Sequence, residues 1–79
     1  MSTKEVILEV LSDLHPEVDD FEAIEELVHG KTLDSLDIVT LVAELSDRFD
    51  IEISPQEICY ENFDTVNGLV KMVDRLQGK

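Results

Sequence analysis

Several residue types that mark particular classes of protein are scarce or missing in this sequence. It has no tryptophan and a single cysteine, Cys59, among 79 residues. One cysteine cannot form an internal disulfide, which fits a reducing compartment, and we expect a cytoplasmic protein. No apolar run approaches the roughly 18 residues that a membrane span requires, and residues 1–5 lack the apolar segment of a signal peptide. We therefore expect no membrane insertion.

Positive charge is also scarce. Six lysines and arginines stand against 19 acidic residues, which leaves a formal net charge of −13. Such a surface repels nucleic acid and anionic lipid, and it attracts basic partners over long distances. The two histidines, His15 and His29, have no neighbours at the spacing of metal ligands, so we expect no metal site.

The length limits the kind of function. A chain of 79 residues forms one small domain, residues 1–79, and buries only about 60–65% of its unfolded surface. We expect no deep catalytic cleft, and the sequence shows no Gly-rich phosphate loop and no paired catalytic carboxylates. Ser35 has no histidine base in evident register, so it is not expected to be a catalytic nucleophile. These absences indicate a protein that is not an enzyme.

The first half of the chain predicts one helix followed by a long connection. Residues 2–5 form a capping-box pattern, with a hydroxyl first and a glutamate three positions later. Apolar residues at helical spacing continue until Pro16, which ends a helix that we place at about residues 3–14. Six of the ten residues 17–26 are acidic, and apolar residues within this stretch predict a short helix or turn against the core. Leu33 is expected to be a buried anchor.

The second half predicts a central helix, a link and two further helices. The central helix runs from Ser35 or Leu36 to about residue 49, and residues 50–53 form an extended link. The Ser-Pro-Gln-Glu pattern at residues 54–57 predicts a short helix that ends near residue 61. Cys59 is expected to be half-buried in it.

The last helix completes the expected fold. Asp64 or Thr65 is its expected N-cap, and it runs to about residue 76. We therefore predict an all-α fold, an antiparallel bundle of three longer helices with a short third helix. The expected core is Ile7, Val10, Leu11, Leu14, Leu41, Val42, Leu45, Phe49, Ile53, Val66, Leu69, Val70 and Val73.

The central helix has two apolar stripes. Residues at i, i+3, i+4 and i+7 form the stripe that should face the core: Ile38, Leu41, Val42, Leu45 and Phe49. The second stripe, Leu36, Val39 and Ala43, lies on another side. A helix in so small a domain rarely buries two sides, so the second stripe is predicted to be exposed and to bind a partner. Ser35, the expected N-cap, would lie beside it. We define the docking face as Asp34, Leu36, Asp37, Val39, Thr40, Ala43, Glu44 and Asp47.

The motif at the start of the central helix, together with the residues behind it, resembles the acyl carrier protein family, which includes peptidyl and D-alanyl carrier proteins. The resemblance covers nearly the whole chain. It rests on residues 33–37 (Leu-Asp-Ser-Leu-Asp), on Thr65-Val66, and on the spacing of the apolar residues Val39, Leu41, Val42, Leu45, Phe49, Ile51 and Ile53.

The resemblance implies both a cofactor and partners. In the family, the serine that matches Ser35 carries a 4′-phosphopantetheine arm, whose thiol holds acyl or aminoacyl groups as thioesters. The chain would then be a monomeric carrier in fatty acid, polyketide or related biosynthesis. Its partners would be a phosphopantetheinyl transferase and loading and processing enzymes with basic docking surfaces.

Two observations bear on the kind of carrier. Thr40 and Ser46 occupy positions where fatty-acid-synthesis members often have acidic residues, and Arg48 adds a positive charge. Leu33 stands where those members often have a small residue. Leu-Asp-Ser is commoner in carriers of specialised or aminoacyl pathways. The alternative hypothesis is an acidic helical adaptor, in which the docking face binds one partner and Ser35 is only a helix cap.

Overall fold

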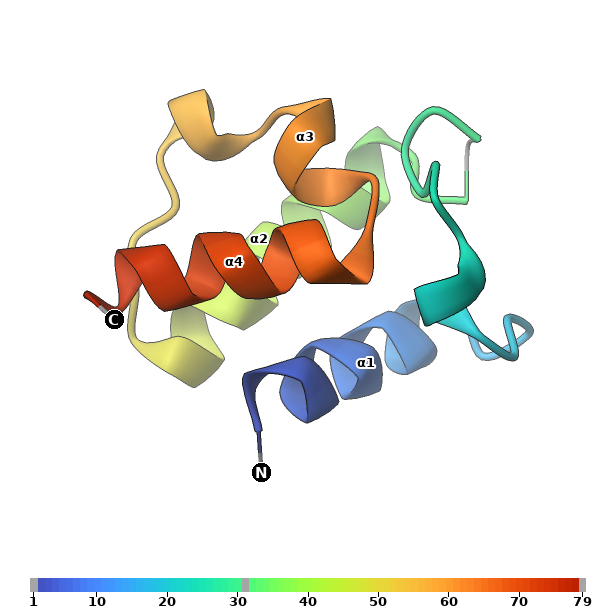
Figure 1. Cartoon of the computed structure of the whole chain (residues 1–79), viewed down its shortest axis with the longest axis horizontal. Coiled ribbons are helices and arrows are strands. Elements are labelled where there is room, and N and C mark those ends of the chain that lie inside the picture. Colours follow the sequence, from blue (N-terminus) through green and yellow to red (C-terminus); the bar gives the residue numbers. More distant parts are fainter. Residues whose placement is uncertain (1, 31, 79) are drawn as a thin grey trace.

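The computed structural model describes residues 2–30 and 32–78, and every element in them is helical (Figure 1). The α-helices are α1 (Thr3–Leu14), α2 (Ser35–Phe49), α3 (Tyr60–Phe63) and α4 (Val66–Leu76). Two short 3₁₀ turns, η1 (Phe21–Ala23) and η2 (Pro55–Glu57), lie in the connections. The predicted all-α fold with three longer helices and a short third one is confirmed. No helix in the described ranges is long and apolar enough to cross a membrane.

The helices do not all alternate in direction. In Figure 1, α1 runs opposite to α2 and α4, while α2 and α4 point the same way, so the expected antiparallel arrangement holds only for α1. The physical reason is the connection 50–65, which carries the chain back along the bundle before α4 begins. α1 packs against both α2 and α4, and α3 packs against α4.

Local capping signals fix the ends of the outer helices. The hydroxyl of Ser2 accepts the backbone N–H of Glu5, and the Glu5 carboxylate accepts the backbone N–H of Ser2, so the predicted capping box of α1 is confirmed. The hydroxyl of Thr65 accepts the N–H of Gly68 at 2.9 Å and caps α4. Of the two expected caps, the structure selects Thr65.

The helix predicted after residue 54 is interrupted. Pro55–Glu57 forms a single 3₁₀ turn, and α3 begins only at Tyr60, so the prediction of one short helix ending near Glu61 is wrong. The Glu57 carboxylate is bound by the Arg75 guanidinium at 2.6 Å and 3.0 Å, which ties η2 to the end of α4. Cys59 lies in the break between the two turns and is exposed, which corrects the expectation that it would be half-buried.

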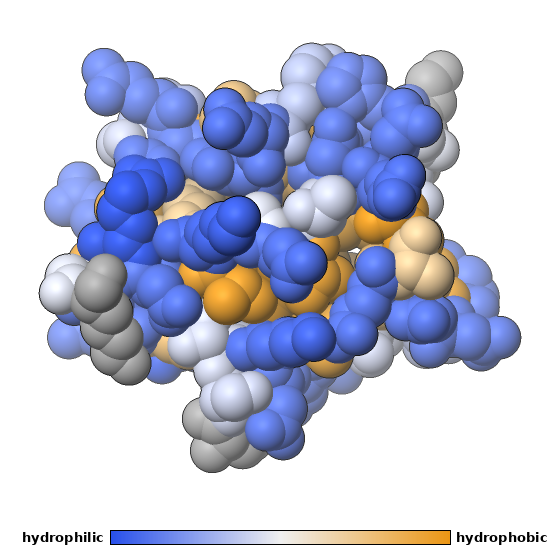
Figure 2. All heavy atoms as spheres, in the orientation of Figure 1, coloured by the Kyte–Doolittle hydropathy of each residue, from blue (hydrophilic) through white to orange (hydrophobic). Residues whose placement is uncertain are grey.

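The core lies where α1, α2 and α4 meet. Nine of the thirteen predicted core residues are buried, and the other four are only partly buried: Leu14, Val42, Phe49 and Val70. Five further residues are buried: Phe21, Leu27, Leu33, Phe63 and Met72. Three of these, Phe21, Leu27 and Leu33, come from the connection between α1 and α2, so the apolar residues of this connection pack into the core. Figure 2 shows mainly hydrophilic side chains on one face of the molecule, with hydrophobic ones visible in a band between them.

Candidate functional site

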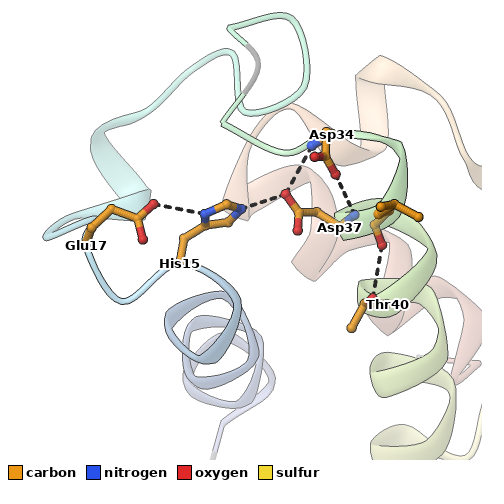
Figure 3. Close-up of polar contacts among 6 residues, drawn as sticks. His15, Glu17, Asp34, Asp37 and Thr40 are labelled. Carbon is orange, nitrogen blue, oxygen red and sulfur yellow. Dashed lines mark hydrogen bonds and ion pairs between the residues drawn. The ribbon is translucent and has the colours of Figure 1, made fainter.

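The start of α2 is capped by Asp34, not by Ser35 as the sequence predicted. The Asp34 carboxylate accepts the backbone N–H of Asp37 at 2.9 Å, and the Asp37 carboxylate accepts the backbone N–H of Asp34 at 3.2 Å (Figure 3). These two bonds form a capping box that satisfies N–H groups at the helix start. Ser35 is therefore the first residue of the helix proper, and it is exposed. Among the described residues, its hydroxyl makes no hydrogen bond, which leaves the oxygen available for chemistry.

The chain that leads into the capping box is anchored in the core. Leu33 is buried, as predicted, and its N–H donates to the carbonyl of Leu27 at 2.8 Å. Leu27 is buried as well, and its own N–H donates to the carbonyl of Asp64, just before α4. Ser35 therefore projects from a helix start that is fixed by burial on one side and by the capping box on the other.

His15, at the C-terminal end of α1, contacts the same capping box. Its Nε2 lies 2.6 Å from Oδ2 of Asp37, and its Nδ1 lies 2.9 Å from Oε2 of Glu17. The hydrogen bond to Asp37 raises the pKa of His15 above its ordinary value, against the smaller opposing effect of burial. Burial would raise the pKa of Asp37, but the hydrogen bonds from His15 and from the Asp34 backbone outweigh it and lower that pKa. This contact was not predicted from the sequence.

A groove of about 520 Å³ lies beside Ser35. Ser35 is one of its lining residues, and the others come from three separate segments of the chain: Val28, Ile38, Ile58, Cys59, Tyr60 and Phe63. The lining is mainly apolar, and Ile58 and Tyr60 are exposed large hydrophobic residues. Sequence reasoning missed this groove because its walls are far apart along the chain.

One wall of the groove is supported by a second histidine. The ring of His29 stacks on Tyr60, with centroids 3.7 Å apart. Nδ1 of His29 lies 2.5 Å from the Asp64 carboxylate, which also accepts the backbone N–H groups of Val28 and His29 at 3.0 Å each. Asp64 was expected only as a possible helix cap. Its observed role is to hold residues 28–29 against the chain between α3 and α4.

The second apolar stripe of α2 is exposed, as predicted. Leu36 is 76% and Val39 66% exposed, and Ala43 is exposed on the same side. Exposed apolar side chains that lie together on one side of a helix offer a surface that another molecule can cover.

The polar members of the docking face differ in their environments. The Thr40 hydroxyl donates to the carbonyl of Leu36 at 3.0 Å, and Glu44 accepts from Nε of Arg48 at 3.2 Å. Asp47 is exposed, whereas the Asp37 side chain is only 19% exposed and belongs to the capping box. Substitution of Asp37 would therefore change both the start of the helix and the surface charge.

The fold and this helix start are those of a small helical carrier domain, and comparison with known proteins identifies the family. The sequence model of the family described as "Phosphopantetheine attachment site" matches residues 5–73. The D-alanyl carrier protein of Streptococcus suis is 34% identical over 76 residues, which cover 96% of each chain. The D-alanyl carrier protein of Lactobacillus acidophilus is 30% identical over the full length of both chains. This chain belongs to the acyl carrier protein family, whose members carry covalently attached 4′-phosphopantetheine.

The residues at the start of α2 fit this group. A phosphodiester bond needs an alcohol that is exposed and not engaged elsewhere, and Ser35 offers such a hydroxyl at the positive end of a helix of 15 residues. The apolar groove next to Ser35 offers a surface for the uncharged part of the arm. Asp34 and Asp37 oppose a nearby anion, so their charges do not stabilise a bound phosphodiester. In the structure, these two residues cap the helix.

Proposed function

We propose that Ser35 is the attachment site of the 4′-phosphopantetheine arm and that the chain carries an aminoacyl group on it. The observation that carries this proposal is the position of Ser35 directly after an aspartate N-cap, where the hydroxyl is exposed and takes no part in capping. The adaptor hypothesis gives Ser35 no function beyond the helix start, and loading of Ser35 by a transferase is the result that distinguishes the two hypotheses.

The chemistry at Ser35 is a transfer from coenzyme A catalysed by a phosphopantetheinyl transferase. Oγ of Ser35 attacks the phosphorus atom that bears the pantetheine group and loses its proton to a base of the transferase. The bond from that phosphorus to the nucleotide breaks, and 3′,5′-bisphosphoadenosine leaves. The arm, once bound, would supply a terminal thiol that takes the acyl group of the cargo from a carboxyl group activated by a partner enzyme, and the activating group leaves. The role of this chain is to present Ser35 and then the loaded arm to its partners.

The cargo that the relatives favour is D-alanine. Both relatives described above are named D-alanyl carrier proteins and align with almost all of this chain. The same class is favoured by Leu33 before Asp34 and by Thr40 on α2, which distinguish the chain from densely acidic carriers of fatty acid synthesis.

Partner enzymes would bind at the docking face. The exposed Leu36, Val39 and Ala43 supply an apolar surface, and the acidic residues around them attract a basic rim. The net charge of −13 steers such partners from a distance. We expect the transferase and the enzyme that activates the amino acid to share this face.

Intact mass spectrometry tests the attachment site. The protein is incubated with coenzyme A and a broad-specificity phosphopantetheinyl transferase, and we expect a gain of one phosphopantetheine in the wild type and none in Ser35→Ala. Ser54→Ala is the matched control, because Ser54 lies at the start of another helical turn, η2, and its hydroxyl makes no capping bond. Absence of a gain in the wild type, or an undiminished gain in Ser35→Ala, would refute the assignment.

A second reaction tests the cargo. The modified protein is incubated with ATP, a D-alanine-activating ligase from a bacterium with such a carrier, and either D-alanine or L-alanine. We expect a D-alanyl thioester that neutral hydroxylamine releases. Loading by acyl-transferring enzymes of fatty acid synthesis in preference to the ligase would contradict the aminoacyl assignment and leave the attachment site standing.

A further inference from the structure

His15 lies between two carboxylates at the point where the end of α1 meets the start of α2 (Figure 3). Its Nε2 is 2.6 Å from Asp37 and its Nδ1 is 2.9 Å from Glu17. Only the protonated imidazolium has an N–H on both ring nitrogens, so both contacts are hydrogen bonds only when the ring is charged. A neutral ring would direct one nitrogen lone pair at a carboxylate.

Asp37 connects this ring to the backbone next to Ser35. Oδ2 of Asp37 accepts from His15 and also from the backbone N–H of Asp34, at 3.2 Å. The Asp34 carboxylate in turn accepts the N–H of Asp37 at 2.9 Å. His15 is itself held in place, because its backbone N–H donates to the carbonyl of Leu11 at 2.9 Å. The capping box that opens α2 is therefore fixed to the end of α1.

We infer that His15 is a positioning residue for the loading of Ser35: its protonated ring holds Asp37 in the capping box and thereby fixes the first turn of α2. His15 acts through Asp37 and Asp34. The inference rests on the proposed role of Ser35 as the attachment site, because only then does the orientation of this turn matter for a reaction.

The charges around the ring set the direction of the pH dependence. The groups that face it are Glu17, from the segment after α1, and Asp37, from α2, and Asp34 joins them through Asp37. The hydrogen bond to Asp37 raises the pKa of His15 above its ordinary value of 6.5, against the opposing effect of burial. The cluster is therefore intact at lower pH, and it opens as the pH rises through the pKa of the folded state.

Amide chemical shifts in the unmodified protein test this connection without any enzyme. The His15 ring and the backbone amides of residues 34–37 are followed by NMR from pH 5.5 to 9. We expect the amides to shift with the midpoint of the ring, above 6.5, and to lose this transition in His15→Gln. His29→Gln is the matched control, because His29 also pairs with a carboxylate but belongs to a different cluster. Amides that do not follow the ring, or that titrate unchanged in His15→Gln, would overturn the inference.

Loading rates test the consequence for Ser35. Wild type and His15→Gln are loaded by the same transferase, and the ratio of their kcat/KM values removes the pH dependence of the enzyme itself. An N-cap contact is typically worth about fivefold in an equilibrium constant. We expect the wild type to be favoured about fivefold at pH 6, and the ratio to fall towards one at pH 9. A ratio that does not change with pH would overturn the inference.

Two further results separate this inference from the function on which it rests. If the wild type is not modified at any pH, the proposed function fails, and the amide titration still decides whether His15 holds the capping box. If His15→Gln does not fold, Glu17→Gln replaces it. That variant removes one partner of the ring and should lower the midpoint of the amide transition towards 6.5. An unchanged midpoint would contradict the inference.

Discussion

Two leucines on α2 offer a sharp test of how this helix is oriented. Leu36 and Leu45 are nine positions apart, which is two and a half turns at about 3.6 residues per turn, so they project from opposite sides of the helix. Leu36 is 76% exposed and Leu45 is fully buried in the core. The same substitution, leucine to alanine, should therefore have very different effects on stability at the two positions.

The expected magnitudes follow from burial. Leu45→Ala removes apolar surface from the packed core and leaves a cavity, which costs about 2–5 kcal/mol. A domain of this length has a free energy of unfolding of only about 4–12 kcal/mol, so the substitution removes a large share of it. Leu36→Ala removes a side chain that already lies in water, and it should change stability by no more than about 0.5 kcal/mol.

Urea unfolding followed by far-ultraviolet circular dichroism measures both effects. We expect the midpoint of Leu45→Ala to fall markedly with an unchanged slope, and the curve of Leu36→Ala to overlap that of the wild type. A loss below about 1 kcal/mol in Leu45→Ala would show that this residue is not in the core. A large loss in Leu36→Ala would refute the assignment of its stripe to the docking face.

Five other perturbations have expected outcomes. Gly68→Ala should lower the free energy of unfolding measured in urea, although alanine favours helices, because a Cβ at this position would lie 2.7 Å from the carbonyl oxygen of Glu61. A more stable variant would contradict this close packing. Val39→Asp should leave the circular dichroism spectrum unchanged and speed dissociation from the transferase, measured by surface plasmon resonance. Asp47→Lys should instead slow association with the transferase at low salt. Loss of folding in Val39→Asp would place that residue in the core. Added salt or divalent cations should raise Tm, because the net charge of −13 repels itself, and an insensitive melt would contradict this. Burial would raise the pKa of Asp64, but hydrogen bonds from His29 and Val28 outweigh burial and lower that pKa. The contribution of Asp64 to stability is therefore present above pH 3.8 and is lost as the pH falls through its folded-state pKa. Asp64→Asn should flatten the acid unfolding curve in this pH range, and an unchanged curve would count against these hydrogen bonds.

The helices and caps that depend on neighbouring residues were predictable from the sequence. The bounds of α1 and α2 follow from apolar spacing and from Pro16, and the caps at Ser2 and Thr65 follow from side chains that reach N–H groups three residues on. The N-cap of α2 could have been predicted by the same rule. Asp34 has an acid three positions later, at Asp37, whereas Ser35 has the apolar Ile38, so only Asp34 can form a capping box.

The features that sequence reasoning missed depend on contacts between distant parts of the chain. The turn at residues 55–57 stops after three residues and is fixed by the pairing of Glu57 with Arg75, 18 positions away. The contact between His15 and Asp37 spans 22 positions. The walls of the groove beside Ser35 likewise come together only in the folded chain. Spacing patterns describe a single helix and carry no information about which segments meet.

The docking face contains residues whose surroundings were predicted correctly and one, Asp37, whose contacts were missed. The phase of Leu36 and Val39 predicted their exposure, because the core stripe already occupies the other side of α2. The same phase placed Asp37 on the docking face, although its side chain turns towards His15 and the helix start. Position on a helical wheel therefore indicates the side of the helix on which a residue lies, whereas the partners of its side chain depend on the packing around it.

The most direct test of the central proposal is to locate the modification within the chain. Trypsin cleaves after Lys31 and Arg48 and releases a peptide of residues 32–48, which contains both Ser35 and Ser46 as well as two threonines. After loading with coenzyme A and the transferase, fragment ions of this peptide assign the phosphopantetheine group to one hydroxyl. We expect all of it on Ser35. Its presence on Ser46 or on a threonine, or on any peptide other than 32–48, would contradict the proposal that the start of α2 carries the arm.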